Sequence, residues 1–399
     1  MKIGIFTYHS QINYGGVLQA YALQQTLMRM GHQACIVDRW LLEKNRSLVG
    51  TFPESTFLGK CKRLLYAILG NGEGAEMLRR YRTSTFIRDN LNLTPYHFID
   101  WKDAPKSLSD FNCFIVGSDQ VWNFHCPDNF FYLLEKCSDV PKISYAASMG
   151  GNVEQFSNDA KRIKDGLKEF KDISVREKTA QRFISNLGLM SEHVVDPTLL
   201  APREIWGRFQ KKRECHRRLF CYFMEDSLKE VFPVLSHYAA ETGSDVDIFF
   251  NDFSQFAVKF SSEYGYLHEW WRLQKAKLWP QIHLHLGAGP VEFVKYASMA
   301  TDAVSDSFHA LMFSIIFNLN VRILTPKSDY RTQMFARIRE FTHKITSGEL
   351  EMDSLDSALS SIQGNTPVLF ARESIEKQRQ KSMKWLTQAL VTVMSDVNH

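Results

Sequence analysis

The sequence predicts an α/β protein made of two Rossmann-like domains, and two observations carry this prediction. Residues 2–7 form a short apolar run that a loop at residues 13–16 follows. A helix-period stretch then ends at Gly31, and a second apolar run occupies residues 34–37. This strand–loop–helix–strand order is the building unit of a doubly wound parallel sheet. The same alternation starts again near residue 200, which predicts a second unit of the same kind.

The remainder of the first domain is expected to supply three more buried strands. Apolar runs of the kind that buried parallel strands require occupy residues 111–116, 142–146 and 172–175. Each run ends in small or polar residues, and the last one ends at Arg176. Ligands of open α/β sheets collect at the carboxyl ends of the strands, so a binding site is expected at these ends. We expect the first domain to span residues 1–175.

The second domain is expected to span residues 176–365. Its strands are expected at residues 219–224, 245–250, 282–286, 303–304 and 322–324, and its helices at residues 228–241, 291–299 and 310–317. Residues 252–280 are rich in aromatic side chains and follow neither period. In the C-terminal segment, residues 366–399, a last helix over about residues 371–393 is expected to return and pack across the first domain.

Composition and charge exclude several classes of protein. Of the 399 residues, 44% are apolar and 23% are charged, which is the balance of a folded soluble protein. No uncharged apolar run reaches the roughly 18 residues that a membrane-spanning helix needs. The opening residues lack the small-residue cleavage site of a signal peptide. A formal charge of +4 gives no reason to expect a nucleic-acid partner.

The cysteine and histidine patterns predict no metal ion. Seven cysteines are scattered along the chain without CxxC spacing, and their number is odd. Neither a structural zinc site nor a disulfide framework is expected, and a reducing cytoplasm is the expected location. His283 and His285 alternate on an expected strand, which we interpret as a strand edge rather than a metal pair. No cofactor is expected either.

Residues 56–91 are expected to be helical and carry many basic side chains. These are Lys60, Lys62, Arg63, Arg79, Arg80, Arg82 and Arg88. A solvated helical face is the interpretation we favour. A peripheral membrane contact is the alternative, because four apolar side chains at positions 64, 65, 68 and 69 lie on a neighbouring face. Glycines between positions 70 and 74 interrupt that helix and weaken the alternative.

Residues 305–311 are the strongest candidate for a chemical site. A strand runs into a turn of hydroxyl and carboxylate residues, and a helix begins at once. The start of a helix offers unpaired backbone N–H groups and a partial positive charge, which suit phosphate or carboxylate. Ser307 can cap this helix and donate to an anion, and His309 in the first turn can exchange protons near neutral pH. The alternative, in which Ser307 only caps and His309 only packs, stays open.

Seven separated segments carry motifs that occur together in one known family. Residues 305–309 are similar to a TDSFHG-type segment, with Ala310 in place of its glycine, and residues 287–300 are similar to a GP-x-x-F segment. Residues 13–23 are similar to NYGAVLQAYAL, with Gly16 in place of the first alanine, and residues 117–123 are similar to GSDQVWN. Residues 144–150, 174–177 and 194–200 are similar to SYAAS-x-G, S-x-R-E and V-x-DPTLL. Taken in their order along the chain, between residues 2 and 345, the segments resemble the polysaccharide pyruvyl transferase family.

The resemblance implies a fold similar to that of the GT-B glycosyltransferases, with the active site between the two domains. It implies transfer of a pyruvyl group from phosphoenolpyruvate to a sugar hydroxyl pair, as a cyclic ketal, on a bacterial surface glycan or exopolysaccharide. The first domain is then the expected acceptor side, and the second is the phosphoenolpyruvate side. Whether the acceptor is lipid-linked or free stays open. The implied location is cytoplasmic, with at most a peripheral contact at the inner membrane surface.

Phosphoenolpyruvate carries up to three negative charges, so its site must supply cations and helix N-termini. Arg176 matches the arginine of the S-x-R-E segment and can clamp a carboxylate or phosphate at two points. A structural ion pair with a neighbouring carboxylate is the alternative for Arg176. His309 is expected to act as a general acid or base, or to contact the phosphate. Ser307, Lys327 and Arg331 are further candidates for binding the donor.

Candidates for binding the acceptor lie in the first domain, at Asn13, Tyr14, Gln19, Asp119 and Gln120. Carboxylates and amides pair with sugar hydroxyls, and aromatic rings stack on sugar faces. For Trp122 we favour packing in the core over contact with a sugar. Two interpretations of Trp270 and Trp271 are equally open. They form a wall or lid of the acceptor site, or they are buried beneath a long loop.

Three other functions compete with pyruvyl transfer. The main alternative is a GT-B-like glycosyltransferase that uses a nucleotide sugar, but the second domain lacks the base-stacking and ribose-binding pattern that such an enzyme usually adds. A dinucleotide-dependent oxidoreductase needs G-x-G-x-x-G spacing, which residues 13–16 do not provide. The third is a non-catalytic glycan-binding relative, and the presence of His309 and Arg176 argues against it.

Overall fold

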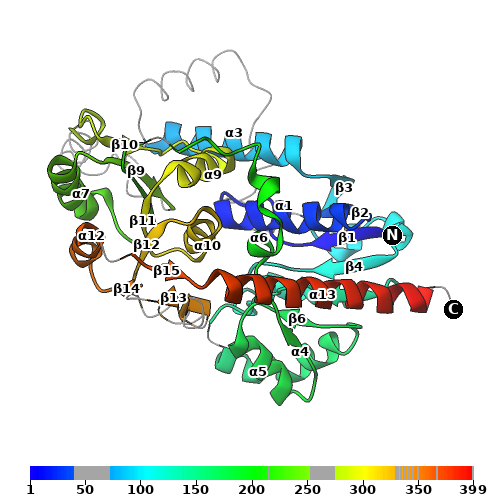
Figure 1. Cartoon of the computed structure of the whole chain (residues 1–399). Helices are drawn as coiled ribbons and strands as arrows, with labels where there is room; N and C mark the ends of the chain where they lie inside the picture. The colour runs from blue at the N-terminus through cyan, green and yellow to red at the C-terminus, as the bar shows by residue number, and fades with distance from the viewer. Residues whose placement is uncertain are drawn as a thin grey trace, which may run out of the picture.

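The structure, a computed structural model, contains two parallel sheets that stand end to end (Figure 1). It describes the whole chain except residues 40–71, 138, 152, 214, 252–274, 329–331, 333–334, 336–337, 340, 343–345, 348–349, 365–366 and 398–399. No helix in the described part is both long enough and apolar enough to cross a membrane.

The first sheet has five parallel strands in the order β3-β2-β1-β4-β5. Along the chain these are β1 (Lys2–Phe6), β2 (Gln33–Arg39), β3 (Leu93–Phe98), β4 (Cys113–Val116) and β5 (Lys142–Ser144). Helix α1 (Tyr14–Arg29) connects β1 to β2, and the sheet grows outward on both sides of β1. This is the strand order of a Rossmann unit. The continuous apolar runs of β1 and β4 are explained by burial on both faces of the sheet.

Helix α1 begins and ends at residues whose chemistry suits those positions. Oδ1 of Asn13 accepts hydrogen bonds from the backbone N–H groups of Gly15 and Gly16, at 2.9 and 3.3 Å. Asn13 is therefore the N-cap, a position where asparagine is favoured. The helix ends at Arg29, and Gly31 then takes a φ of +87°, which glycine adopts without a steric penalty.

A small unit made of β6 (Ser174–Val175), α5 (Lys178–Asn186) and β7 (Glu192–His193) extends the first sheet. Isolated bridges join Ile143 to Asp172 and Ala147 to Val175, and β6 pairs with β7 in parallel. The expected domain boundary at residue 175 therefore falls between two strands that pair with each other. We propose that the first domain continues through β7 and that the crossing into the second domain follows it.

The second sheet has six parallel strands in the order β10-β9-β8-β11-β12-β14. Its strands are β8 (Arg218–Phe223), β9 (Asp245–Phe250), β10 (Ile282–Leu284), β11 (Asp302–Ser305), β12 (Asn320–Leu324) and β14 (Glu351–Met352). The helices around it are α7 (Leu228–Thr242), α9 (Pro290–Met299), α10 (Phe308–Phe317) and α12 (Leu355–Gln363). Counted from β8, the order is 3-2-1-4-5-6, so the second unit repeats the Rossmann arrangement and confirms the predicted fold class.

The two units share one hydrophobic core rather than meeting at a wet surface. Tyr14 of α1 stacks on Phe293 of α9 with ring centroids 4.6 Å apart. Trp206 contacts Tyr21 on one side, at 5.8 Å, and Phe313 of α10 on the other, at 4.9 Å. Aromatic side chains of this size each bury roughly 150–250 Å². Their burial between the sheets fixes how the two units sit against each other.

The C-terminal helix α13 (Arg372–Val397) runs back along the first unit and ends near its outer edge (Figure 1). Leu386, Leu390 and Val393 are buried in the shared core. The Ser382 hydroxyl accepts a hydrogen bond of 3.0 Å from the backbone N–H of Val195. The expected return of this helix to the first domain is confirmed.

The remaining described elements are short or lie at the periphery. They are α3 (Gly72–Asn90), α4 (Ala160–Leu167), α6 (Pro197–Leu200), the antiparallel pair β13 (Thr346–Ser347) and β15 (Leu369–Phe370), and five 3-10 helices at Trp101–Asp103, Lys106–Asp110, Pro127–Leu133, Val153–Asp159 and Arg203–Trp206. Of these, α3 contacts α9 and packs Phe86 on Tyr21 of α1, and α6 contacts α1 and α10, so both helices touch both units.

Candidate active site between the two domains

A cluster of charged side chains lies where the starts of four helices, α1, α5, α6 and α10, and the ends of two strands, β4 and β6, converge. Arg176 and Glu177 follow β6, Asp119 follows β4, Asp196 begins α6 and His309 lies in the first turn of α10. All five are buried or nearly so. Asp119, Arg176 and Glu177 come from the first unit, Asp196 from the segment that follows β7, and His309 from the second unit. The cluster therefore exists only because the two units pack together.

Arg176 is held by three carboxylates. Its Nη1 donates to Oδ2 of Asp196 at 2.8 Å, its Nε donates to Oε1 of Glu177 at 3.3 Å, and its Nη2 lies 3.6 Å from Oδ1 of Asp119. Burial alone would lower the pKa of Arg176, but the three carboxylates outweigh it and raise the pKa above its usual value. The guanidinium is therefore a permanent positive charge.

Asp196 links Arg176 to the second domain. Its Oδ1 accepts from the backbone N–H and the hydroxyl of Thr198, at 2.9 and 2.7 Å, which caps α6. Its Oδ2 accepts the hydrogen bond from Nη1 of Arg176 and lies 3.8 Å from Nε2 of His309. Burial raises the pKa of Asp196, but the charges of His309 and Arg176 and the hydrogen bonds outweigh it, so the pKa is lowered. Asp196 stays ionised between two basic groups.

His309 packs directly on the start of α1. A Cβ atom built on Gly15 would lie 2.0 Å from Nδ1 of His309, so only glycine leaves room for the ring. Gly16, the next residue, faces Oδ2 of Asp119 with 3.1 Å to a built Cβ. Asp119 reaches this position from a turn in which its φ is +64°, a conformation that aspartate takes more readily than most residues.

The electrostatics of the cluster suit an anionic ligand at the helix starts. Helices α1, α5 and α10 all begin here, and each contributes a partial positive charge and unpaired N–H groups. One guanidinium is opposed by three carboxylates, so the side chains alone would repel an anion. The helix starts and a protonated His309 are the groups that can offset those carboxylates. His309 can also move a proton, and Oδ2 of Asp196 lies 3.8 Å from its Nε2.

The sequence pattern of the polysaccharide pyruvyl transferase family matches residues 13–328 of the chain. The chain belongs to this family. The match includes the segments that carry Asp119, Arg176, Asp196 and His309. No protein among curated sequences matches the chain.

Solved structures support the GT-B-like fold of this family member. It is similar to UDP-GlcNAc 2-epimerase from Methanocaldococcus jannaschii, with a TM-score of 0.52 and 10% identity over 97% of this chain and 100% of that chain. It is also similar to UDP-N-acetylglucosamine 2-epimerase from Rickettsia bellii, with a TM-score of 0.54 and 10% identity over 99% of this chain and 97% of that chain. At this identity the likeness speaks for the fold alone.

The expected donor residues do not all gather at the cluster. Ser307 is the N-cap residue of α10 and is buried, but its side chain makes no capping bond. The Lys327 side chain is 60% exposed and pairs with Asp226 and with Glu230, the latter at 3.0 Å, instead of pointing at Arg176. Hydrogen bonds to these two carboxylates raise the pKa of Lys327. Arg331 lies outside the described residues.

Two of the expected acceptor residues have structural partners that a sugar would have to displace. Gln19 is fully buried, and its amide donates to the Thr7 hydroxyl and the Gly16 carbonyl, both at 2.8 Å. Tyr14 is buried in the shared core, and its hydroxyl donates to the Ala288 carbonyl at 3.0 Å. The acceptor roles expected for Gln19 and Tyr14 stay predictions, and a sugar would have to compete with these partners for either side chain.

The other acceptor candidates lie at the first-domain rim of the cluster. Asn13 caps α1, as described above, and Oε1 of Gln120 accepts from the Asn123 amide at 3.0 Å. Asp119 contacts the Arg176 guanidinium. Trp122 is fully buried and its indole N–H donates to the Tyr132 carbonyl at 3.3 Å, which agrees with the favoured core role. Trp270 and Trp271 lie outside the described residues.

Asp196 and the interdomain role of two arginines were not predicted from the sequence. Asp196 had a detectable signal, since aspartate before proline and threonine is a helix start. Arg79 and Arg82 had none, because both read as part of a basic helical face. Arg79 is fully buried, and Arg82 donates to the Gly287 carbonyl at 3.0 Å. The expected solvated face is therefore wrong for Arg79, and residues 56–71 of that stretch lie outside the described residues.

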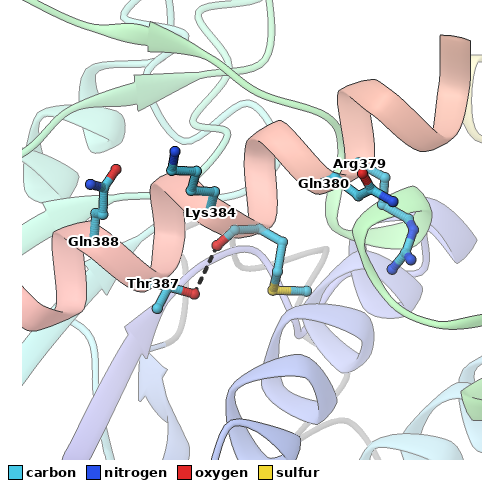
Figure 2. A pocket seen from close by; sticks show the side chains of 6 residues that line it. Arg379, Gln380, Lys384, Thr387 and Gln388 are labelled. Carbon is cyan, nitrogen blue, oxygen red and sulfur yellow. Dashed lines mark hydrogen bonds between the residues drawn. The ribbon is translucent and has the colours of Figure 1, made fainter.

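The expected strand-edge pair and a surface depression lie outside the cluster. His283 and His285 pair with Asp245 and Asp247, at 3.1 and 2.6 Å, at the β10 edge of the second sheet. Across the described residues, no three His, Cys, Asp or Glu side chains are arranged to hold a metal ion. A depression of about 380 Å³ lies along α13 and is lined by Arg379, Gln380, Met383, Lys384, Thr387 and Gln388; Figure 2 shows these side chains. None of the charged cluster lines it.

Proposed function

We propose that the chain transfers the pyruvyl group of phosphoenolpyruvate to a pair of sugar hydroxyls and forms a cyclic ketal on a glycan. One observation carries this proposal beyond family membership. Arg176 of the first domain and His309 of the second both approach Oδ2 of Asp196, at 2.8 and 3.8 Å, where α1 and α10 begin. A fixed cation, a titratable imidazole and helix N-termini are the groups that an enol phosphate requires.

The Nη2 group of Arg176 is the part of the guanidinium that we assign to the donor. It is buried and makes no hydrogen bond to any described residue, and it lies 3.6 Å from Asp119, beyond hydrogen-bond range. A carboxylate or phosphate oxygen placed there would gain a charge-assisted hydrogen bond. The first N–H groups of α10 would bind the other anionic end of the donor.

In the proposed reaction the donor loses phosphate and the acceptor loses two hydroxyl protons. A proton is added to the methylene carbon of the enol, and C2 becomes electrophilic. One sugar hydroxyl forms a bond to C2, phosphate leaves with the C2–O electron pair, and the second hydroxyl closes the ring at C2. We assign a proton-transfer step to His309, because Oδ2 of Asp196 lies 3.8 Å from its Nε2 and Gly15 lies against its Nδ1 side.

The acceptor is proposed to be a bacterial surface glycan or exopolysaccharide intermediate, pyruvylated in the cytoplasm. Family membership supports a polysaccharide acceptor. Asp119 and Gln120, at the first-domain rim of the cluster, are the groups proposed to meet its hydroxyls. A carboxylate and an amide suit that role.

Phosphate release from phosphoenolpyruvate, measured with a panel of glycan acceptors, tests the proposal. We expect acceptor-dependent release by the wild type and loss of it in His309→Ala. The matched control is His237→Ala, since His237 is 75% exposed and pairs with Glu241 in its own helix. A thermal shift by UDP-sugars but not by phosphoenolpyruvate would instead favour a nucleotide-sugar enzyme. Release that His309→Ala leaves unchanged would refute the assigned role of His309.

A further inference from the structure

Helix α3 packs on the first domain with its C-terminal half and on the second domain with its N-terminal half. Phe86 is buried against Tyr21 of α1, with ring centroids 5.7 Å apart. At the other end, Leu78 packs on Gly287, where a built Cβ would lie 2.7 Å from Cδ2 of Leu78. Figure 1 shows α3 running beside α9 toward β3. The helix therefore spans the interface as a single rigid rod.

Arg79, midway along α3, binds both domains at once. Its Nη1 donates to the carbonyl of Phe250, the last residue of β9, at 2.9 Å. Its Nη2 donates to the carbonyl of Ile12, in the loop between β1 and α1, at 2.9 Å. The guanidinium also stacks over the Tyr14 ring, 4.1 Å from its centroid. The side chain is fully buried, so these contacts lie away from solvent and are not screened by it.

The Ile12 contact connects Arg79 to the charged cluster. Ile12 immediately precedes Asn13, which caps α1, and two residues later Gly15 touches His309. Holding the Ile12 carbonyl therefore sets where the first turn of α1 lies. Holding the Phe250 carbonyl ties that turn to the sheet that also carries α10. A planar fork of N–H donors suits this task, because it fixes two acceptors at a defined angle.

We propose that Arg79 is a positioning residue, which sets the start of α1 against the second domain and so fixes the fit of Gly15 to His309. The proposal rests on the proposed function for its kinetic consequence, although the geometry it concerns is independent of the reaction. Misplacing a catalytic group by about 1 Å can reduce a rate by about 100-fold. The alternative is that Arg79 only stabilises the interface and leaves His309 in place.

The test compares Arg79 with its neighbour on the same helix. Arg80 pairs with Glu76 at 2.7 Å, one turn earlier on the same helix, so Arg80→Met removes a neighbouring arginine whose ion pair lies within α3. Arg79→Met removes both carbonyl contacts. Arg79→Lys keeps the charge and the stem, but its single nitrogen cannot reproduce the planar fork over Tyr14. If Arg79→Met fails to fold, Arg79→Lys decides the question.

Two readouts are needed, kcat/KM for phosphoenolpyruvate and the NMR signal of the His309 ring, assigned by comparison with His309→Ala. We expect Arg79→Lys and Arg79→Met to lose about 10-fold or more in kcat/KM, and the His309 signal to shift in both but not in Arg80→Met. An unmoved His309 signal in both Arg79 variants would overturn the proposal. So would kcat/KM values equal to that of Arg80→Met. If the wild type releases no phosphate, the proposed function fails, while the NMR comparison still judges Arg79.

Discussion

Gly15 and His309 lie so close that a Cβ atom on Gly15 would sit 2.0 Å from Nδ1 of the imidazole. The two residues come from different domains, and neither position leaves room for a larger partner. The start of α1 therefore acts as a template for the orientation of His309. Asp196 defines the other side of the ring, at 3.8 Å from Nε2.

The Gly15→Ala variant tests this fit. Alanine suits a helix, but its methyl group must push the His309 ring aside, so we expect a loss of about 1–3 kcal/mol in the free energy of unfolding and of about 100-fold in turnover. Phosphate release and urea unfolding measure the two effects. Gly364→Ala is the control, because a Cβ there meets nothing nearer than 3.4 Å. Wild-type turnover in Gly15→Ala would show that the ring can move without consequence.

The Asp196→Asn variant tests the link between Arg176 and His309. Asparagine still caps α6, but it removes the charge that faces the guanidinium and the imidazole. We expect a loss of about 3 kcal/mol in the free energy of unfolding at pH 7. Urea unfolding measures it, and turnover should fall as well because His309 loses its orienting group.

The same variant has a predicted pH dependence. The pKa of Asp196 is lowered in the folded protein, so its contribution to stability is fully present above its unfolded pKa of about 3.9 and is lost as the pH falls through the lower folded pKa. The stability difference between wild type and Asp196→Asn should therefore shrink in acid stronger than the unfolded pKa of about 3.9, as the pH falls through the folded pKa. A difference that stays undiminished in such acid would contradict this assignment.

The Glu230→Gln variant tests the N-terminal cap of α7. Glu230 accepts from the backbone N–H of Ser227 at 2.8 Å and pairs with Lys327. The Ser227 hydrogen bonds and Lys327 lower the pKa of Glu230 to about 2. Its side chain is 51% exposed, so solvent screens much of this interaction and we expect a loss of only about 1 kcal/mol. That loss should be present near neutral pH and vanish as the pH falls from about 4.3 toward the folded pKa.

The Tyr14→Phe variant tests whether Tyr14 serves the interface or a sugar. Removing the hydroxyl leaves the Ala288 carbonyl without this donor, at a cost of about 1–2 kcal/mol in the free energy of unfolding. Burial raises the pKa of Tyr14, so the phenol stays neutral and the loss should be the same from pH 6 to pH 9. An unchanged stability together with a raised KM for the acceptor would restore the expected sugar contact.

Local patterns in the sequence were sufficient to predict most elements of the two sheets. The apolar runs at residues 2–7 and 245–250 became β1 and β9, and the turn before His309 became the start of α10. The predicted domain boundary at residue 175 did not take the pairing between β6 and β7 into account. Two-residue strands are too short to produce a periodic signal, so their pairing depends on contacts that the pattern does not contain.

The sequence by itself determined where strands end and helices begin, because burial on both faces and helix capping are local properties of neighbouring residues. It also carried the motif segments of Arg176 and His309. Only the tertiary structure decided that Asp196 joins those two residues, that Gln19 and Tyr14 are buried, and that Arg79 crosses the interface. The contacts of Arg79 with Phe250 and of Tyr14 with Ala288 span 171 and 274 positions. Such contacts depend on how the two sheets pack through a shared core, and the local hydrophobic periodicity of the sequence contains no information about that packing.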